Sequence, residues 1–172
     1  MGILELKNMN NIKFVPVKDS DFPTIKEIYD YYILNSTATF HTKPVSIKEL
    51  KEYIFVDHQL YKSYLVYCNI EIAGYCYFSY FKKRQAYNRT AEVTLYLKPE
   101  FCRKGLGIEI LNYIEDTAKQ TNIKNLIAVI TDSNTGSIRL FEKAGYKKCA
   151  HYIKVGEKFG KILDVVGYQK II

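Results

Sequence analysis

Four segments of the chain repeat apolar residues at the spacing of an amphipathic helix. The first follows Ser20 and Asp21, which can cap a helix, and its apolar positions are Ile25, Ile28, Tyr29, Tyr32 and Ile33. Ser46 and Glu49 form a capping-box pattern, which predicts a second, shorter helix carrying Leu50, Tyr53 and Ile54. The other two helices are expected over residues 105–120 and 135–144, and Gly145 ends the last one.

Strand-like runs alternate with these helices. The alternation is clearest at residues 91–97, where Glu92, Thr94 and Tyr96 share the polar face. Further strands are expected at residues 12–17, 63–68, 72–81, 126–130, 146–155 and 163–172. The runs 63–68 and 72–81 are separated by Asn69 and predict a hairpin. Because no repeat or linker divides the chain, the pattern predicts a single α/β domain of mixed α+β type over residues 1–172, with a central sheet.

Composition supports a folded, reduced protein. The 172 residues are 48% hydrophobic and 25% charged, which is typical of a globular chain that buries its own core. Residues 1–10 hold no signal-peptide core, and the longest apolar run, residues 72–78, is too short to cross a bilayer. The four cysteines form no C-x-x-C pair, and the cysteines and the three histidines form no cluster with the spacing of a zinc site. We therefore expect a cytoplasmic protein with no metal and no membrane partner.

The charge balance indicates an anionic partner. Lys and Arg number 25 against 18 Asp and Glu, which gives a formal net charge of +7. Positive potential concentrates anions near the surface, although it does not select among them. The basic residues are scattered and form no basic arm, so a phosphorylated cofactor fits as well as nucleic acid does.

The most informative segment is YLKPEFCRKGLG at residues 96–107, where a strand leads through a glycine-containing turn into a helix. The first turn of a helix has unpaired N–H donors, and glycine lets the backbone approach a bound anion, so this segment can bind a pyrophosphate. Arg103 and Lys104 add positive charge. Residue 110 is Ile, which excludes the G-x-G-x-x-G form, and no G-K-[ST] follows. A capping turn without a ligand would have the same pattern.

At this segment the sequence resembles the GNAT acetyltransferase superfamily, whose acetyl-CoA loop has the form Q/R-x-x-G-x-G/A. The matching residues are 102–107, followed by Asn134, Ser137 and LFEKAGY at residues 140–146. The segments TATF (37–40), RQAY (84–87), AEVTLYL (91–97) and VGEKFGKILDV (155–165) resemble the phosphinothricin N-acetyltransferase branch. The resemblance implies the GNAT fold, with a mostly antiparallel twisted sheet flanked by about four helices, acetyl-CoA as co-substrate, and a homodimer.

The resemblance also implies roles for particular residues. Glu92 corresponds to the general base; the open alternative is an ordinary polar residue on a solvated strand face. Acetyl-CoA would be held by Leu95, Tyr96, Leu97, Arg103, Lys104, Gly105, Leu106, Gly107, Ile108, Asn134, Ser137 and Phe141. The acceptor would be held by Phe40, Arg84 and Tyr87, of which Arg84 suits a carboxylate or phosphinate; a solvated Arg in the run 82–84 is the alternative.

Two positions depart from the family pattern. Cys102 stands where the loop normally begins with Gln or Arg, which removes one side-chain contact to the phosphates. Phe141 stands where many members have Tyr and where the phosphinothricin branch often has His. Phenylalanine cannot donate a proton to the leaving sulfur.

The function expected from the sequence is transfer of acetyl from acetyl-CoA to the α-amino group of a small amino acid or analogue, such as phosphinothricin, methionine sulfone or methionine sulfoximine. An α-amino group, with a pKa near 8, loses its proton more easily than a lysine amine does. The partner is then a small-molecule amine and not nucleic acid. Two alternatives stay open, namely acetylation of a protein or peptide amine, and a non-catalytic module that binds acetyl-CoA or nucleic acid.

Overall fold

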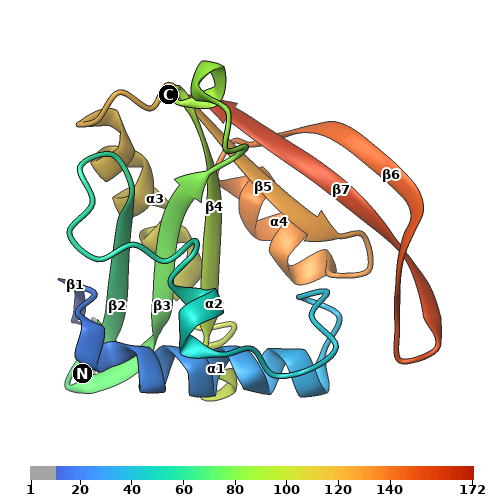
Figure 1. Ribbon diagram of the computed structural model, residues 1–172, viewed down its shortest axis with the longest axis horizontal. Coiled ribbons are helices and arrows are strands. Elements are labelled where there is room, and N and C mark those ends of the chain that lie inside the picture. Colours follow the sequence, from blue (N-terminus) through green and yellow to red (C-terminus); the bar gives the residue numbers. More distant parts are fainter. Residues whose placement is uncertain (1–10) are drawn as a thin grey trace, which may run out of the picture.

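The computed structural model describes residues 11–172 and is built on a seven-stranded sheet (Figure 1). The expectation for residues 1–10, that they hold no signal peptide, concerns a segment outside the described residues. The strands are β1 (Ile12–Pro16), β2 (Lys62–Cys68), β3 (Glu71–Tyr80), β4 (Thr90–Leu97), β5 (Asn125–Thr131), β6 (Lys147–Lys158) and β7 (Lys161–Ile171). Their order is β1-β2-β3-β4-β5-β7-β6, and each neighbouring pair is antiparallel except β4 and β5.

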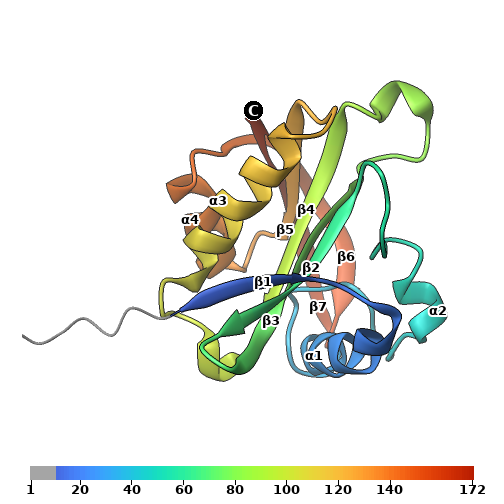
Figure 2. The same cartoon turned by 90° about the vertical axis from the view of Figure 1, so that its left-hand side faces the viewer.

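Helices cover both faces of this sheet (Figure 2). On one face lie α1 (Phe22–Asn35) and α2 (Ile47–Leu50), and on the other α3 (Leu106–Lys119) and α4 (Thr135–Lys143). Phe22, Ile25 and Ile33 of α1 are fully buried, and burial of each such side chain contributes about 2 kcal/mol. A second cluster lies under α3. This arrangement confirms the mixed class and the mostly antiparallel sheet.

The structure corrects the expected bounds of two regions. The second helix is a single turn, α2, because the backbone then tightens: Glu52 N donates to Glu49 O, and Phe55 N donates to Ser63 Oγ of β2. The last hairpin is longer than expected, because β6 and β7 continue to a two-residue turn at Phe159 and Gly160, both with positive φ. Its exposed, partly charged tip has no apolar alternation from which the strands could be recognised.

The parallel pair β4 and β5 positions the site. Thr90, Ala91 and Glu92 pair with β5, whereas β4 continues to Leu97 with no further pairing to β5. On its other side β4 pairs with β3 all the way to Leu97. The two central strands therefore separate after Glu92. None of the helices within residues 11–172 is long and apolar enough to cross a membrane.

Candidate functional site

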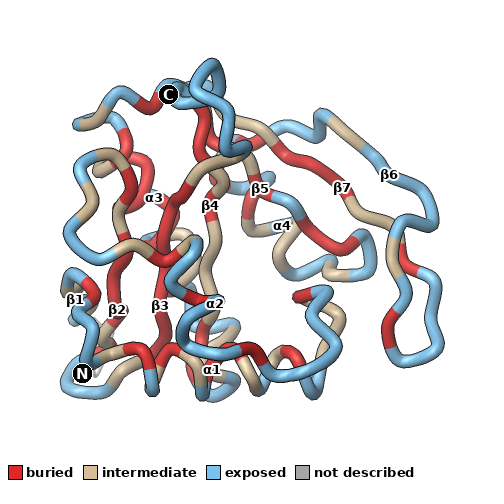
Figure 3. Tube along the Cα trace, in the orientation of Figure 1, coloured by how far each residue is buried: buried red, intermediate tan, exposed pale blue. Residues whose placement is uncertain are grey.

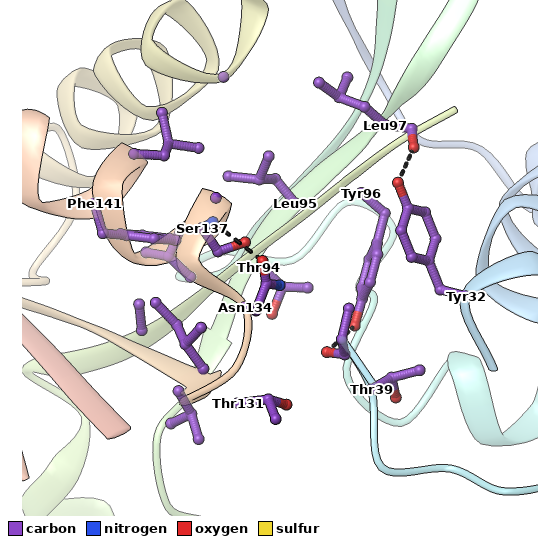
Figure 4. Close-up of a pocket in the computed structure, with 18 of the residues that line it drawn as sticks. Tyr32, Thr39, Thr94, Leu95, Tyr96, Leu97, Thr131, Asn134, Ser137 and Phe141 are labelled. Atoms are coloured by element: carbon purple, nitrogen blue, oxygen red, sulfur yellow. Dashed lines mark hydrogen bonds between the residues drawn. The ribbon is translucent and has the colours of Figure 1, made fainter. Parts of the chain in front are cut away.

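A cavity of about 1070 Å³ opens where β4 and β5 separate. Its walls come from β4, the turn before α3, the start of α4, and α1 with the loop that follows it, which is called here the acceptor loop (residues 36–46) (Figure 4). The volume is at the upper end of the range for small-molecule sites, about 1,000 Å³, so a large ligand fits.

The open edge of β4 forms one wall. Leu95, Tyr96 and Leu97 line the cavity, and their backbone has no partner strand on the β5 side. An unpaired strand edge presents N–H and C=O groups that can bind an extended chain of amides, as an added strand would.

The N-terminus of α3 forms a second wall. Gly105 precedes the helix with φ of 83°, and no side chain caps the N-terminal N–H groups. A Cβ at Gly105 would meet nothing within 4 Å, so the left-handed backbone and not space calls for glycine there. Arg103, also left-handed with φ of 60°, lines the cavity beside this turn. Unpaired donors and a guanidinium together suit an anion.

The rest of the predicted cofactor loop divides into two parts. Gly105, Leu106, Gly107 and Ile108 line the cavity, whereas Lys104 does not; its Nζ lies 5.4 Å from the Phe101 ring centroid. Gly107 has a packing role as well, because a Cβ there would lie 2.7 Å from Leu140 Cδ2 of α4.

Residues at the start of α4 complete this side (Figure 4). Asn134 caps α4, with its Oδ1 accepting from Ser137 N at 3.2 Å, and both residues line the cavity. Phe141 also lines it, is 5% exposed and stacks edge-on against Tyr146. Cys102 lines it too, with its Sγ 3.7 Å from the Tyr32 hydroxyl.

Glu92 lies on β4 where the strands separate. Its side chain is half-buried and lines the cavity on the same strand face as Thr94 and Tyr96. The sequence predicted that this face of the strand is polar. In the structure it borders the cavity and not open solvent. Burial raises the pKa of Glu92, and the positive charge of Lys82 opposes this only in part. A carboxylate with a raised pKa is a suitable proton acceptor.

The predicted acceptor residues are not brought together. Phe40 lines the cavity, but Arg84 and Tyr87 belong to an exposed turn between β3 and β4 and do not. The Arg84 guanidinium instead lies 5.4 Å from the Tyr87 ring centroid. Their roles stay predictions.

Several lining residues were not found from the sequence. The side of the cavity next to α1 is rich in aromatic and hydroxyl groups, from Tyr29, Tyr32, Thr39, Tyr53 and Tyr77. The Tyr29 hydroxyl shares hydrogen bonds with Thr39 Oγ1 at 2.6 Å and with His41 Nδ1 at 2.7 Å. Helical spacing made Tyr29 and Tyr32 look like core positions, and only the TATF segment pointed to Thr39.

Known proteins share this architecture. A phosphinothricin N-acetyltransferase of Alcaligenes faecalis is 30% identical over 156 residues, covering 90% of this chain and 79% of that protein. An L-methionine sulfoximine/L-methionine sulfone acetyltransferase of Pseudomonas paraeruginosa is 26% identical, covering 87% of this chain and 88% of that protein. The crystal structure of a GNAT superfamily phosphinothricin acetyltransferase from Sinorhizobium meliloti in complex with AcCoA aligns with a TM-score of 0.86 at 26% identity, covering 94% of this chain and 88% of that one.

The family match extends over most of the described fold. The acetyltransferase (GNAT) domain family matches residues 14–166, from β1 into β7, and so includes each wall of the cavity. The chain therefore belongs to the GNAT family of acetyltransferases and has the fold and the enzyme class of that family.

Proposed function

We propose that this protein transfers acetyl from acetyl-CoA to the α-amino group of a small amino acid or analogue, of the phosphinothricin and methionine sulfone class. One observation carries the proposal: the separation of β4 from β5 opens a single cavity that holds an unpaired strand edge, an uncapped helix N-terminus and a half-buried carboxylate. The names of the relatives support the substrate class.

The cavity walls fit the co-substrate. The amide groups of the pantetheine arm would pair with the backbone of Leu95–Leu97, and the pyrophosphate would accept from the N–H groups of residues 105–108 beside Arg103. Asn134 already caps α4 through its Oδ1, which leaves its amide nitrogen for a ligand. Acetyl-CoA supplies the acetyl group as a thioester.

Glu92 would take a proton from the acceptor. An ammonium group has no lone pair for attack, so its proton passes to the Glu92 carboxylate directly or through one water. The neutral amine nitrogen then bonds to the acetyl carbon while the carbon–sulfur bond breaks, and the nitrogen loses its second proton to water as the amide forms. A backbone N–H of the unpaired part of β4 can donate to the carbonyl oxygen on which negative charge develops. Phe141 donates no proton, so the sulfur leaves as thiolate or is protonated by water.

A thiol-release assay tests the proposal. Wild-type protein is incubated with acetyl-CoA and, in turn, phosphinothricin, methionine sulfone and methionine sulfoximine. We expect turnover with at least one of them, and Glu92→Gln should lower kcat by roughly a hundredfold or more at neutral pH, as loss of a general base does. Acetyl-CoA affinity, measured by calorimetry, should stay nearly unchanged. Absence of turnover with every small amine would contradict the proposed acceptor class.

The setting in which the enzyme works is also part of the proposal. Its four cysteines are free, which suits the reducing cytoplasm.

Residues 1–172 would act as one domain, and two copies would pair through the β6–β7 hairpin. That hairpin exposes apolar side chains, at Tyr152, Ile153, Val155, Phe159 and Ile162, and β6 is an edge strand.

A further inference from the structure

A buried lysine lies behind the acceptor side of the cavity. Lys158, at the end of β6, is 3% exposed, and its Nζ donates to the Thr39 carbonyl oxygen at 2.8 Å. Most of β6 is exposed (Figure 3), whereas Lys158 at its end is buried. The contact joins residues 119 positions apart in the chain.

Lys158 has no carboxylate partner among residues 11–172. No ion pair of the described part of the chain includes it. Its ammonium group makes a cation–π contact with the Phe159 ring, whose centroid lies 5.1 Å from Nζ. An ammonium group has three N–H donors, and one of these is used on Thr39. Burying a charge without a counter-ion costs free energy, and an anion bound nearby would recover part of that cost.

The charge lies next to the cavity wall. Thr39 and Phe40 both line the cavity, and the Phe40 ring rests on β6, where a Cβ on Gly156 would lie 2.2 Å from Phe40 Cε2. The hairpin tip therefore supports two consecutive residues of the acceptor loop. The lysine and arginine side chains that line the cavity, Arg103 and Lys143, come from the turn before α3 and from α4.

We propose that Lys158 determines acceptor specificity, because its charge behind Thr39 favours amines that also carry an acid group, carboxylate or phosphinate, over the same amines without one. This inference rests on the proposed function. It assigns the acid-selecting charge to a residue that the cavity wall touches, whereas Arg84 lies in an exposed turn. The residue acts through position and field at the wall, not on the reacting atoms.

Paired ligands test the inference. Binding of methionine sulfone and of its carboxamide, which lacks the acid, is measured by calorimetry with coenzyme A present. In wild type the acid should bind more tightly than the carboxamide, by roughly several-fold to tenfold, because a charge that acts from behind the wall attracts an acid group more weakly than a direct hydrogen-bond partner would. Lys158→Gln keeps a donor for Thr39 but removes the charge, so the ratio of the two Kd values should fall close to one. Lys158→Arg should keep most of the ratio.

Lys161→Gln is the matched control. Lys161 is exposed and pairs with Lys158 across the same hairpin, so this change removes one positive charge from the hairpin end without touching the acceptor loop. Its Kd ratio should equal that of wild type, and circular dichroism should show all variants folded.

Two results would overturn the inference. One is a wild type that binds acid and carboxamide equally well. The other is a Lys158→Gln variant that loses affinity for both ligands by the same factor, which would make the lysine a structural support only. If wild type turns over other amines but binds neither ligand, the proposed acceptor class fails as well. If methionine sulfone is turned over normally but the Kd ratio of Lys158→Gln equals that of wild type, only the role of Lys158 in specificity is contradicted.

Discussion

At the scale of single residues, Glu92 combines a chemical role with a cost to folding. Burial raises its pKa because the charged form loses hydration, and the positive charge of Lys82 offsets only part of this rise. The ionised carboxylate that would take the proton is therefore also the form that the folded protein disfavours.

The pH dependence of the rate should report this group. We expect kcat/KM to rise with pH through an acid limb that lies above the range of an ordinary glutamate, about 4.3. The limb should be absent in the residual rate of Glu92→Gln, because amide groups do not titrate there. A limb that is the same in both proteins would assign it to another group.

Stability provides a control that does not need turnover. Because the folded pKa of Glu92 is raised, its contribution to the free energy of unfolding is fully present below its unfolded pKa and is lost as pH rises through the folded pKa. The free energy of unfolding of wild type, relative to Glu92→Gln, should therefore decrease between acid and neutral pH. A difference that does not change with pH would show that the folded protein does not perturb this carboxyl.

Gly156 belongs to the same scale, because its missing side chain leaves room for Phe40. In Gly156→Ala the new Cβ would lie 2.2 Å from Phe40 Cε2, and the ring, which is 38% exposed, would rotate aside. We expect KM for the acceptor to rise several-fold while KM for acetyl-CoA and the unfolding temperature stay close to wild type. Equal changes in both KM values would mean that the acceptor loop does not act on the acceptor alone.

At the scale of elements, the close contact of β3 with β4 keeps the strand edge in place. A Cβ at Gly74 would lie 2.2 Å from the Tyr96 carbonyl oxygen and 2.9 Å from Leu97 Cα. These are backbone atoms and cannot rotate away. Gly74→Ala should therefore destabilise the protein by at least about 2 kcal/mol in urea unfolding, as overpacking does.

A second glycine serves as the control. Gly136 lies in the first turn of α4, and the nearest atom to its added Cβ would be 3.8 Å away. Gly136→Ala should leave stability unchanged or raise it by up to about 1 kcal/mol, because alanine favours the helix. A Gly74→Ala protein as stable as this one would show that β3 and β4 have room to separate.

A partly buried ion pair connects β7 to α3. Lys170 Nζ lies 2.6 Å from Glu115 Oε2 and donates to the Ala144 carbonyl oxygen, while Glu115 is 4% exposed. Lys170→Met would leave the carboxylate buried without its partner, which should cost about 3 kcal/mol in chemical unfolding. The double variant Lys170→Met, Glu115→Gln should recover part of the loss. No recovery would indicate that the lost packing of the lysine stem dominates.

At the scale of the whole molecule, the exposed hairpin predicts association. Ile153 is 67% exposed on the edge strand β6. Wild type should have twice the mass of one chain in light scattering, and Ile153→Lys should shift it toward a single chain at micromolar concentration because a charge opposes apolar contact there. As a control, Ile70→Lys changes a 92% exposed residue in the β2–β3 turn and should leave the mass unchanged. A wild type with the mass of one chain would contradict the dimer.

Much of the fold could be predicted from local patterns. Helical spacing located α1, α3 and α4, and alternation located β4, because each of these elements has one face packed in the core; the side-chain cap expected from Ser20 or Asp21 does not form at α1. The patterns failed where packing does not require alternation, as at the exposed tip of β6 and β7, and where a tertiary contact interrupts a helix, as Ser63 does after α2.

The site divides in the same way. The glycine turn at residues 105–108 could be recognised from the strand, turn and helix pattern, and Glu92 and Asn134 could be singled out from the resemblance to the GNAT family. Tyr29 and Thr39 could not, because their place on the cavity wall depends on how α1 and the acceptor loop pack across the sheet.

By itself the sequence determined the order of the elements, the uncapped helix start and the carboxylate on β4, since short-range spacing and residue chemistry specify these. Only the tertiary structure decided that β4 and β5 separate after Glu92, that Arg84 lies outside the cavity, and that Lys158 lies behind Thr39. These features depend on contacts between residues up to 119 positions apart, for which local spacing holds no information.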